Sequence, residues 1–164
     1  MNSQLYLFLD IDGVLNSESS FKYYYEIWKY NKHVEMEAPI DEQRVLIFKD
    51  LCQEIEKMGY NVHIILSSTW RNAENLVEMV QTRLGKHDLE IENQTPYIPA
   101  TPRGEEIRVF CQQHHISKES VLILDDHDDM DDYIDRLIQT YDRDGLTYRD
   151  SERAIALLLK TNSI

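Results

Sequence analysis

Three short apolar runs, separated by helical patterns, constrain the fold of this chain more than any other feature. The second run is too apolar for an exposed edge strand and is typical of a buried parallel strand. The runs predict strands over Leu5–Ile11, Val62–Leu66 and Val121–Leu124. Amphipathic segments predict helices over Asp41–Met58, Asn72–Leu84, Gly104 to about His115, and Glu152–Lys160. This alternation predicts an α/β fold with a mainly parallel central sheet between layers of helices.

The remaining segments complete a single domain over residues 1–164. A chain of 164 residues is long enough to bury a core without disulfides or a structural metal. Gln94–Pro102 contains three of the four prolines and predicts a loop, and a weaker strand is expected near Arg136–Tyr141. Residues at about 17–38 form an aromatic-rich insert.

The net charge of −13, from 30 acidic and 17 basic residues, bears on the partners of the chain. Affinity for nucleic acid without sequence preference comes largely from cationic contacts to phosphates, so we expect no strong nonspecific binding of this kind. Much of the acidic excess lies in Asp125–Asp135, where a bound divalent cation would offset part of it.

Cysteine usage and the N-terminal segment predict a cytoplasmic protein. Cys52 and Cys111 lack the spacing of zinc or redox motifs, so we expect both to be reduced. The first twelve residues contain only five consecutive apolar residues, which predicts neither a signal peptide nor a membrane span. The oligomeric state is not predicted by these features.

Each predicted strand ends in polar residues. Asp10 and Asp12 follow the first, Ser67, Ser68 and Arg71 follow the second, and Asp125 and Asp126 follow the third. Ligands of a parallel α/β sheet bind at the carboxyl ends of its strands. Two carboxylates that lie close together either bind a cation or have different pKa values, because the charge of one makes ionisation of the other harder. Carboxylates, hydroxyls and an arginine at one edge suit a phosphate ester together with Mg²⁺, which prefers oxygen ligands.

The motifs at these strand ends resemble those of the haloacid dehalogenase (HAD) superfamily of phosphohydrolases. Leu7–Leu15 is similar to the D-x-D-G-x-[TV] signature, Ser67 to the strand-end hydroxyl, Arg103 to the basic residue at a helix start, and Asp125-Asp126 to the acidic motif. Leu66–Arg71, Thr101–Ile107 and Ile123–Asp126 further resemble the small capless HAD domains of RNA-repair and polynucleotide kinase-phosphatase proteins. The resemblance implies a three-layer, Rossmann-like sandwich with little or no cap domain.

The resemblance also implies roles for these residues. Asp10 would attack phosphorus and form an aspartyl-phosphate, while Asp12 would protonate the leaving oxygen and later activate water. Mg²⁺ would bind Asp10, the Asp12 carbonyl and Asp125, with Asp126 either as a further ligand or as a residue that orients the ligands. Ser67 and Arg103 would hold the phosphoryl group, with Ser68 as an alternative to Ser67, and Arg71 would contact substrate.

Several features keep more than one interpretation. For Arg71, the alternative to contact with substrate is an ion pair with a surface carboxylate. The acidic run Asp125–Asp132 resembles a calcium loop but lacks its glycine. Its later acids are better explained as a solvated face (Asp128, Asp129, Asp131 and Asp132), with support of the site as the alternative for Asp129. The aromatic segment Phe21–Tyr30 either flanks the site and stacks on a base or aryl group, or packs its rings on the sheet.

The function expected from these features is Mg²⁺-dependent hydrolysis of a phosphomonoester, on a nucleic-acid end or another large substrate. Two alternatives remain. A protein (phosphotyrosine) phosphatase would use the same open site on a phosphoprotein. A receiver-like module would bind or accept phosphoryl groups without efficient turnover.

Overall fold

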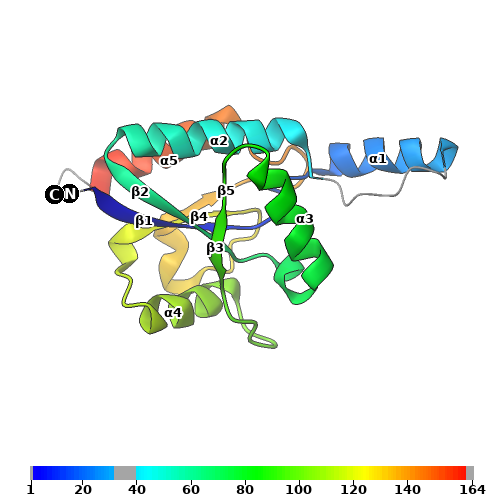
Figure 1. Cartoon of the computed structure of the whole chain (residues 1–164). Coiled ribbons are helices and arrows are strands. Elements are labelled where there is room, and N and C mark those ends of the chain that lie inside the picture. Colours follow the sequence, from blue (N-terminus) through cyan, green and yellow to red (C-terminus); the bar gives the residue numbers. More distant parts are fainter. Residues whose placement is uncertain (1, 32–39, 162–164) are drawn as a thin grey trace.

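The described residues form a five-stranded parallel sheet between helices (Figure 1). The computed structural model describes residues 2–31 and 40–161, apart from the side chains of Tyr24 and Trp28. The strand order is β3-β2-β1-β4-β5, and all four pairings are parallel. The strands are β1 (Ser3–Leu9), β2 (Tyr60–Leu66), β3 (Ile91–Gln94), β4 (Val121–Asp125) and β5 (Leu137–Gln139). The predicted α/β class and parallel sheet are confirmed.

Five α-helices accompany the strands in the described part of the chain. They are α1 (Glu18–Tyr30), α2 (Glu42–Lys57), α3 (Glu74–Gly85), α4 (Arg103–Gln113) and α5 (Tyr148–Thr161). Short 3-10 helices occur at Thr69–Asn72, Lys118–Ser120 and Asp131–Arg136. None of the described helices is long and apolar enough to span a membrane.

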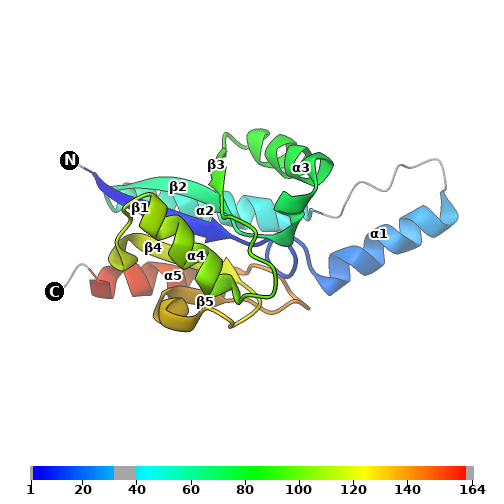
Figure 2. The same ribbon diagram turned by 90° about the horizontal axis from the view of Figure 1, so that it is seen from below.

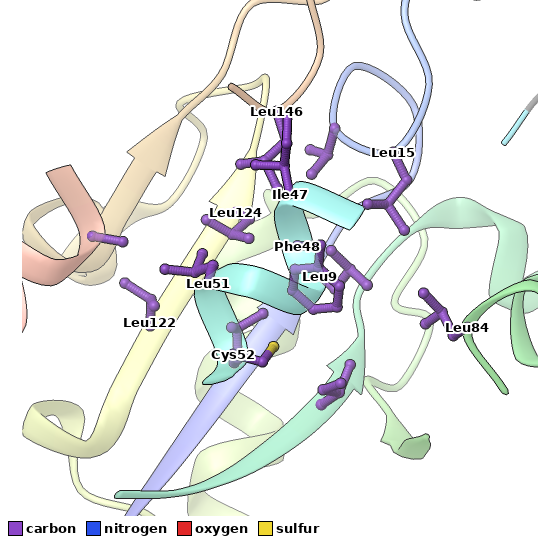
Figure 3. Close-up of a cluster of buried hydrophobic side chains, with 14 of the residues drawn as sticks. Leu9, Leu15, Ile47, Phe48, Leu51, Cys52, Leu84, Leu122, Leu124 and Leu146 are labelled. Carbon is purple, nitrogen blue, oxygen red and sulfur yellow. The ribbon is translucent and has the colours of Figure 1, made fainter. Parts of the chain in front are cut away.

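The side chains of each strand point alternately to the two faces of the sheet, and a hydrophobic core lies on each face. Leu7 and Leu9 of β1 join the core beneath α2 and α5, whereas Phe8 joins the core beneath α4. Successive strand residues point to opposite faces, so a strand that is apolar on both sides must be covered on both sides. Figure 3 shows the first core, in which Leu9, Leu122 and Leu124 lie beneath Phe48 and Leu51 of α2. These contacts define the three layers.

Some predicted boundaries were wrong. The strand β3 was not predicted, because it is four residues long and three of them are exposed and polar. The helix expected from Asn72 begins at Glu74, after the 3-10 helix. The final helix begins at Tyr148 rather than Glu152, because Thr147 and Asp150 cap it: the backbone N–H of Thr147 donates to Asp150 Oδ2 at 3.0 Å.

The aromatic segment forms α1, which extends away from the three layers (Figures 1 and 2). Its start is held to the turn after β5, since the Glu18 N–H donates to the Asp142 carbonyl at 3.0 Å. Its exposed rings are Phe21, Tyr23, Tyr25 and Tyr30, which are 45–80% exposed. For these four residues, the interpretation that the rings pack on the sheet is wrong. Residues 32–38 of the expected insert lie outside the described residues. The described connections contain no separate cap domain.

Candidate active site

The register of the sheet brings the polar ends of three strands together. Leu9 of β1 lies opposite Leu66 of β2 and Leu124 of β4. The next residue on each strand is therefore Asp10, Ser67 or Asp125. Backbone hydrogen bonds continue across this line: the Ser67 N–H donates to the Leu9 carbonyl at 2.9 Å, and the Asp10 N–H donates to the Leu124 carbonyl at 3.0 Å. The carboxyl edge of β2-β1-β4 thus carries two carboxylates and a hydroxyl.

Asp10 and Asp125 are both buried, at 6% and 0% exposure. Burial raises the pKa of the Asp10 carboxyl, whereas the positive charge of Arg103 and hydrogen bonding to Ser68 lower it. Burial also raises the pKa of Asp125, and the neighbouring charge of Asp10 raises it further. Two carboxylates removed from water at short range favour the arrival of a positive charge between them.

The positive charge of Arg103 acts on both carboxyl groups of this pair. Its Nε lies 3.8 Å from Asp125 Oδ2, and its side chain is 14% exposed. As the first residue of α4, it places a cation at the positive end of the helix dipole, which is unfavourable for the helix alone. The site carboxylates offset this cost.

The first turn of α4 is fixed to the loop that follows β4. The Arg103 N–H donates to Asp129 Oδ2 at 3.0 Å, and the Gly104 N–H donates to the Asp129 carbonyl at 3.0 Å. A Cβ on Gly104 would overlap the Met130 backbone, so only glycine permits this approach. Asp129, expected either on a solvated face or as a support of the site, caps the helix that carries Arg103.

Three buried polar atoms around Asp10 have no hydrogen-bond partner among the described residues. They are Ser67 Oγ, Asp125 Oδ2 and Arg103 Nη1. Buried polar groups are nearly always paired, and exceptions require an explanation such as an ion or ligand. A hydroxyl, a carboxylate and a guanidinium together match a phosphate with a divalent cation: the carboxylate suits the metal, and the two donors suit phosphate oxygens. The residues present therefore fit a metal such as Mg²⁺.

Asp12 is held by two side chains. Trp70 Nε1 donates to Asp12 Oδ2 at 2.9 Å, and Asn16 Nδ2 donates to Asp12 Oδ1 at 2.8 Å. Asn16 Oδ1 in turn accepts from the Gly13 N–H at 2.9 Å. Gly13 has φ +73°, and a Cβ there would lie 2.6 Å from the Asp126 carboxylate. Glycine thus allows the loops after β1 and β4 to meet.

Ser68 and Arg71 face protein groups. Ser68 Oγ accepts from the Trp70 N–H at 3.3 Å, whereas Ser67 Oγ is unpaired. Arg71 Nη1 donates to the carbonyls of Ser67 and Ser68 at 2.6 and 2.7 Å. Arg71 Nη2 pairs with the buried carboxylate of Glu106, and the Arg71 side chain is only 2% exposed. In this structure Arg71 therefore ties the β2 loop to α4, and the surface carboxylate considered for it is a buried one.

Asp126 lies at the outer side of the site. Asp125, Asp126 and His127 each place a ligand atom within 4.8 Å of the others, and exposure increases along this series. The His127 N–H donates to Asp125 Oδ1 at 2.9 Å, so Asp125 Oδ2 remains available. His127 was not anticipated from the sequence, because a histidine after two aspartates has no distinctive spacing.

Asn16, Trp70 and Glu106 were also missed as parts of the site. Trp70 and Glu106 lie within phrases that carried the family resemblance, which was the available signal. Their contacts with Asp12 and Arg71 span 58 and 35 residues, and no local pattern predicts such pairings.

Comparison with known proteins agrees with the geometry. The family described as the HAD domain in Swiss Army Knife RNA repair proteins matches residues 6–151. The chain belongs to this family. It is a HAD-superfamily domain, and its resemblances to the HAD superfamily and to the HAD domains of RNA-repair proteins are confirmed.

No curated protein matches this HAD domain. A crystal structure described as a predicted phosphatase from Clostridium acetobutylicum is similar over 100% of both chains, with 10% sequence identity and a TM-score of 0.46.

Proposed function

We propose that this HAD domain is a Mg²⁺-dependent phosphomonoester hydrolase that acts through an aspartyl-phosphate on Asp10, and that residues 1–164 form one such domain. The observation that carries the proposal is the group of three unpaired buried atoms, Ser67 Oγ, Arg103 Nη1 and Asp125 Oδ2, beside the Asp10 carboxylate. One bound phosphate and one cation would give each of these atoms a partner.

The reaction has two steps. A carboxylate oxygen of Asp10 attacks phosphorus, the bond from phosphorus to the substrate oxygen breaks, and Asp12 gives its proton to that leaving oxygen. Asp12, now a carboxylate, takes a proton from a water molecule that attacks the phosphorus of the aspartyl-phosphate. Inorganic phosphate leaves, and Asp10 and Asp12 return to their starting states. Trp70 and Asn16 keep the Asp12 side chain oriented through both steps.

Asp10, the Asp12 carbonyl, Asp125 and Asp126 are the groups that would hold Mg²⁺. The metal supplies positive charge that reduces repulsion between the Asp10 carboxylate and the anionic substrate. Ser67 and Arg103 would bind the phosphoryl oxygens. Hydrogen bonding to Ser68 lowers the pKa of Asp10. Arg71 positions the Ser67 backbone rather than contacting substrate.

A phosphorylated nucleic-acid end is the substrate that the observations favour. The family is described from RNA repair proteins, and the described residues place no cap domain over the carboxyl edge. Because the net charge is −13, nonspecific attraction of nucleic acid to the domain is weak. Recognition of a nucleic-acid end must therefore come from contacts near the site. A phosphotyrosine-containing protein is the alternative to be tested beside it.

The test compares phosphate release from an aryl phosphate, end-phosphorylated oligonucleotides and phosphotyrosine peptides, with Mg²⁺ and with chelator. Asp10→Asn should abolish metal-dependent release, because the amide cannot act as the nucleophile. The matched control is Asp88→Asn, between α3 and β3 at the amino end of the strands, where φ of +61° suits asparagine. Undiminished activity of Asp10→Asn would disprove the mechanism. A single stable phosphorylation without turnover would support the receiver-like alternative.

A further inference from the structure

A polar cavity lies at the carboxyl end of β5, outside the group of catalytic residues. Its volume is about 380 Å³, within the range of pockets that bind small ligands. We call it the β5 cavity. Gly145 and the buried Asp150 line it, together with Gln139, Tyr141, Asp144, Thr147, Arg149 and Arg153. None of these residues has a role in the proposed hydrolysis.

The wall of the β5 cavity is built on the catalytic loops. Gln139 Nε2 donates to the Asp126 carbonyl at 2.9 Å, and the Thr140 Oγ donates to the Gly13 carbonyl at 2.7 Å. In the sheet, β5 is separated from β1 only by β4, so the ends of β1 and β5 are about 10 Å apart. When the phosphate of a substrate lies at Asp10, the chemical group next to that phosphate is therefore close enough to enter the β5 cavity.

The β5 cavity is lined by two arginines and two aspartates, of which Asp150 is paired with Arg153. Arg149 and Arg153 are four residues apart on α5, so they project from the same face of the helix. Arg153 uses Nη1 for the Gln139 carbonyl and Asp150 Oδ1, which leaves its other donors available. The guanidinium of Arg149 is exposed and has neither an ion pair nor a hydrogen bond within the described part of the chain. An unpaired arginine beside the strongly acidic edge is suited to a second negative charge on the substrate.

An aromatic ring lies on the rim of the same cavity. Tyr141 is 73% exposed, and it lines the cavity together with the arginines. Exposed tyrosines bind single-stranded nucleic acid by stacking on bases. Gln139 and Asp144 add a donor and acceptors for sugar or base groups. A phosphodiester, a base and a sugar are the groups of a nucleotide, whereas a phosphopeptide carries neither a phosphodiester nor a base.

We propose that the β5 cavity binds the nucleotide adjacent to the phosphorylated end of an oligonucleotide, with Arg149 on its phosphodiester and Tyr141 stacked on its base. This inference rests on the proposed hydrolysis at Asp10 and adds a specificity site to it. The cavity selects a polynucleotide end over a mononucleotide.

The experiment measures kcat/KM for a trinucleotide phosphorylated at its 3′ or its 5′ end and for an aryl phosphate that has no diester. Arg149→Gln should lower kcat/KM for one of the trinucleotides about tenfold more than for the aryl phosphate, the loss of a charged hydrogen bond. Tyr141→Ala should have a similar selective effect of about tenfold, and Tyr141→Phe should restore stacking. The control Arg83→Gln makes the same charge change on α3, beside the opposite edge of the sheet, and should affect neither substrate.

A binding measurement separates this inference from the proposed reaction. The same trinucleotides are titrated into the Asp10→Asn protein at several salt concentrations. Adding Arg149→Gln should weaken binding and reduce the slope of log Kd against log salt by about 0.7, the value for one phosphate contact on a single strand. This result is expected whether or not phosphate is released.

Equal losses on trinucleotide and aryl phosphate, or an unchanged salt slope, would overturn the assignment of the cavity while leaving hydrolysis at Asp10 intact. A larger loss on a phosphotyrosine peptide than on either trinucleotide would also overturn it, in favour of a peptide. Absence of phosphate release by the wild-type protein from every substrate would overturn the proposed function alone, with the cavity judged by the binding titration.

Discussion

At the scale of single residues, the buried pair of Arg71 and Glu106 determines how the loop after β2 is held. Arg71 binds the carbonyls of Ser67 and Ser68, and Glu106 accepts both from Arg71 and, through Oε1, from the Ile98 N–H at 3.0 Å. The pair therefore joins the β2 loop, the loop before α4 and α4 itself. Its loss would disturb the position of Ser67 without removing any group that touches phosphate.

We predict that Arg71→Ala lowers the free energy of unfolding by about 3–5 kcal/mol, because it leaves the Glu106 charge buried without its partner. Glu106→Gln should also destabilise the protein, because the Glu106 side chain is only 7% exposed and its carboxylate accepts from Arg71 and from the Ile98 N–H. It should lower kcat as well, although the Glu106 carboxylate binds protein groups. Urea unfolding and steady-state kinetics measure both effects. A stable Arg71→Ala protein that shows only a raised KM would instead indicate direct contact of Arg71 with substrate.

The residues of the site differ in how far the sequence predicted them. The neighbouring positions of Asp10, Ser67 and Asp125 follow from parallel strands whose apolar runs end together, so the sequence pattern was sufficient. The bond between Trp70 and Asp12 depends on the direction of a side chain after a 3-10 turn. Such a direction is fixed by packing, and no periodicity encodes it.

At the scale of elements, the start of α4 depends on one glycine. Alanine usually stabilises a helix relative to glycine by about 1 kcal/mol. At Gly104, however, the added Cβ would overlap the Met130 carbonyl, which belongs to the loop bonded to Arg103. At Gly85, the last residue of α3, a Cβ would have no atom within 4 Å.

We predict opposite signs for the same substitution at these two positions. Gly104→Ala should lower the free energy of unfolding by about 1–3 kcal/mol and reduce kcat, because the overlap moves α4 and with it Arg103. Gly85→Ala should be neutral or stabilising by up to about 1 kcal/mol. Urea denaturation gives both values, and a stabilised Gly104→Ala protein would contradict the close approach of α4 to Met130.

The elements that were predicted well are those whose residues are buried on both sides. The apolar runs of β1, β2 and β4 identified the three central strands, because burial on two faces requires nearly continuous apolar sequence. The edge strand β3 has only Ile91 partly buried, so its sequence resembles a loop. For α1, aromatic density predicted a segment that packs or binds, and its exposed rings exclude packing on the sheet for the four described.

At the scale of the whole molecule, the fold concentrates negative charge where the strands end. The chain has a net charge of −13, and Asp10, Asp125 and Asp126 converge at one edge. The two hydrophobic cores must therefore hold two crowded, buried carboxyl groups together when no cation is bound, and burial with the charge of Asp10 raises the pKa of Asp125 to about 8. Metal binding and global stability are coupled in such a protein, because a ligand that binds only the folded state stabilises it.

We predict that Mg²⁺ raises the urea midpoint of the wild-type protein, by about 2.7 kcal/mol in unfolding free energy at a concentration of 100 times Kd. In chelator, Asp125→Asn should unfold at a higher urea concentration than wild type, because burial beside Asp10 raises the pKa of Asp125 to about 8 and so makes this carboxyl group destabilising at neutral pH, whereas the amide does not ionise. In Mg²⁺ the order should reverse, since the variant lacks a metal ligand. Asp88→Asn, at the amino end of the strands, should follow wild type in both conditions. A variant that gains as much stability from Mg²⁺ as wild type does would place the metal away from Asp125.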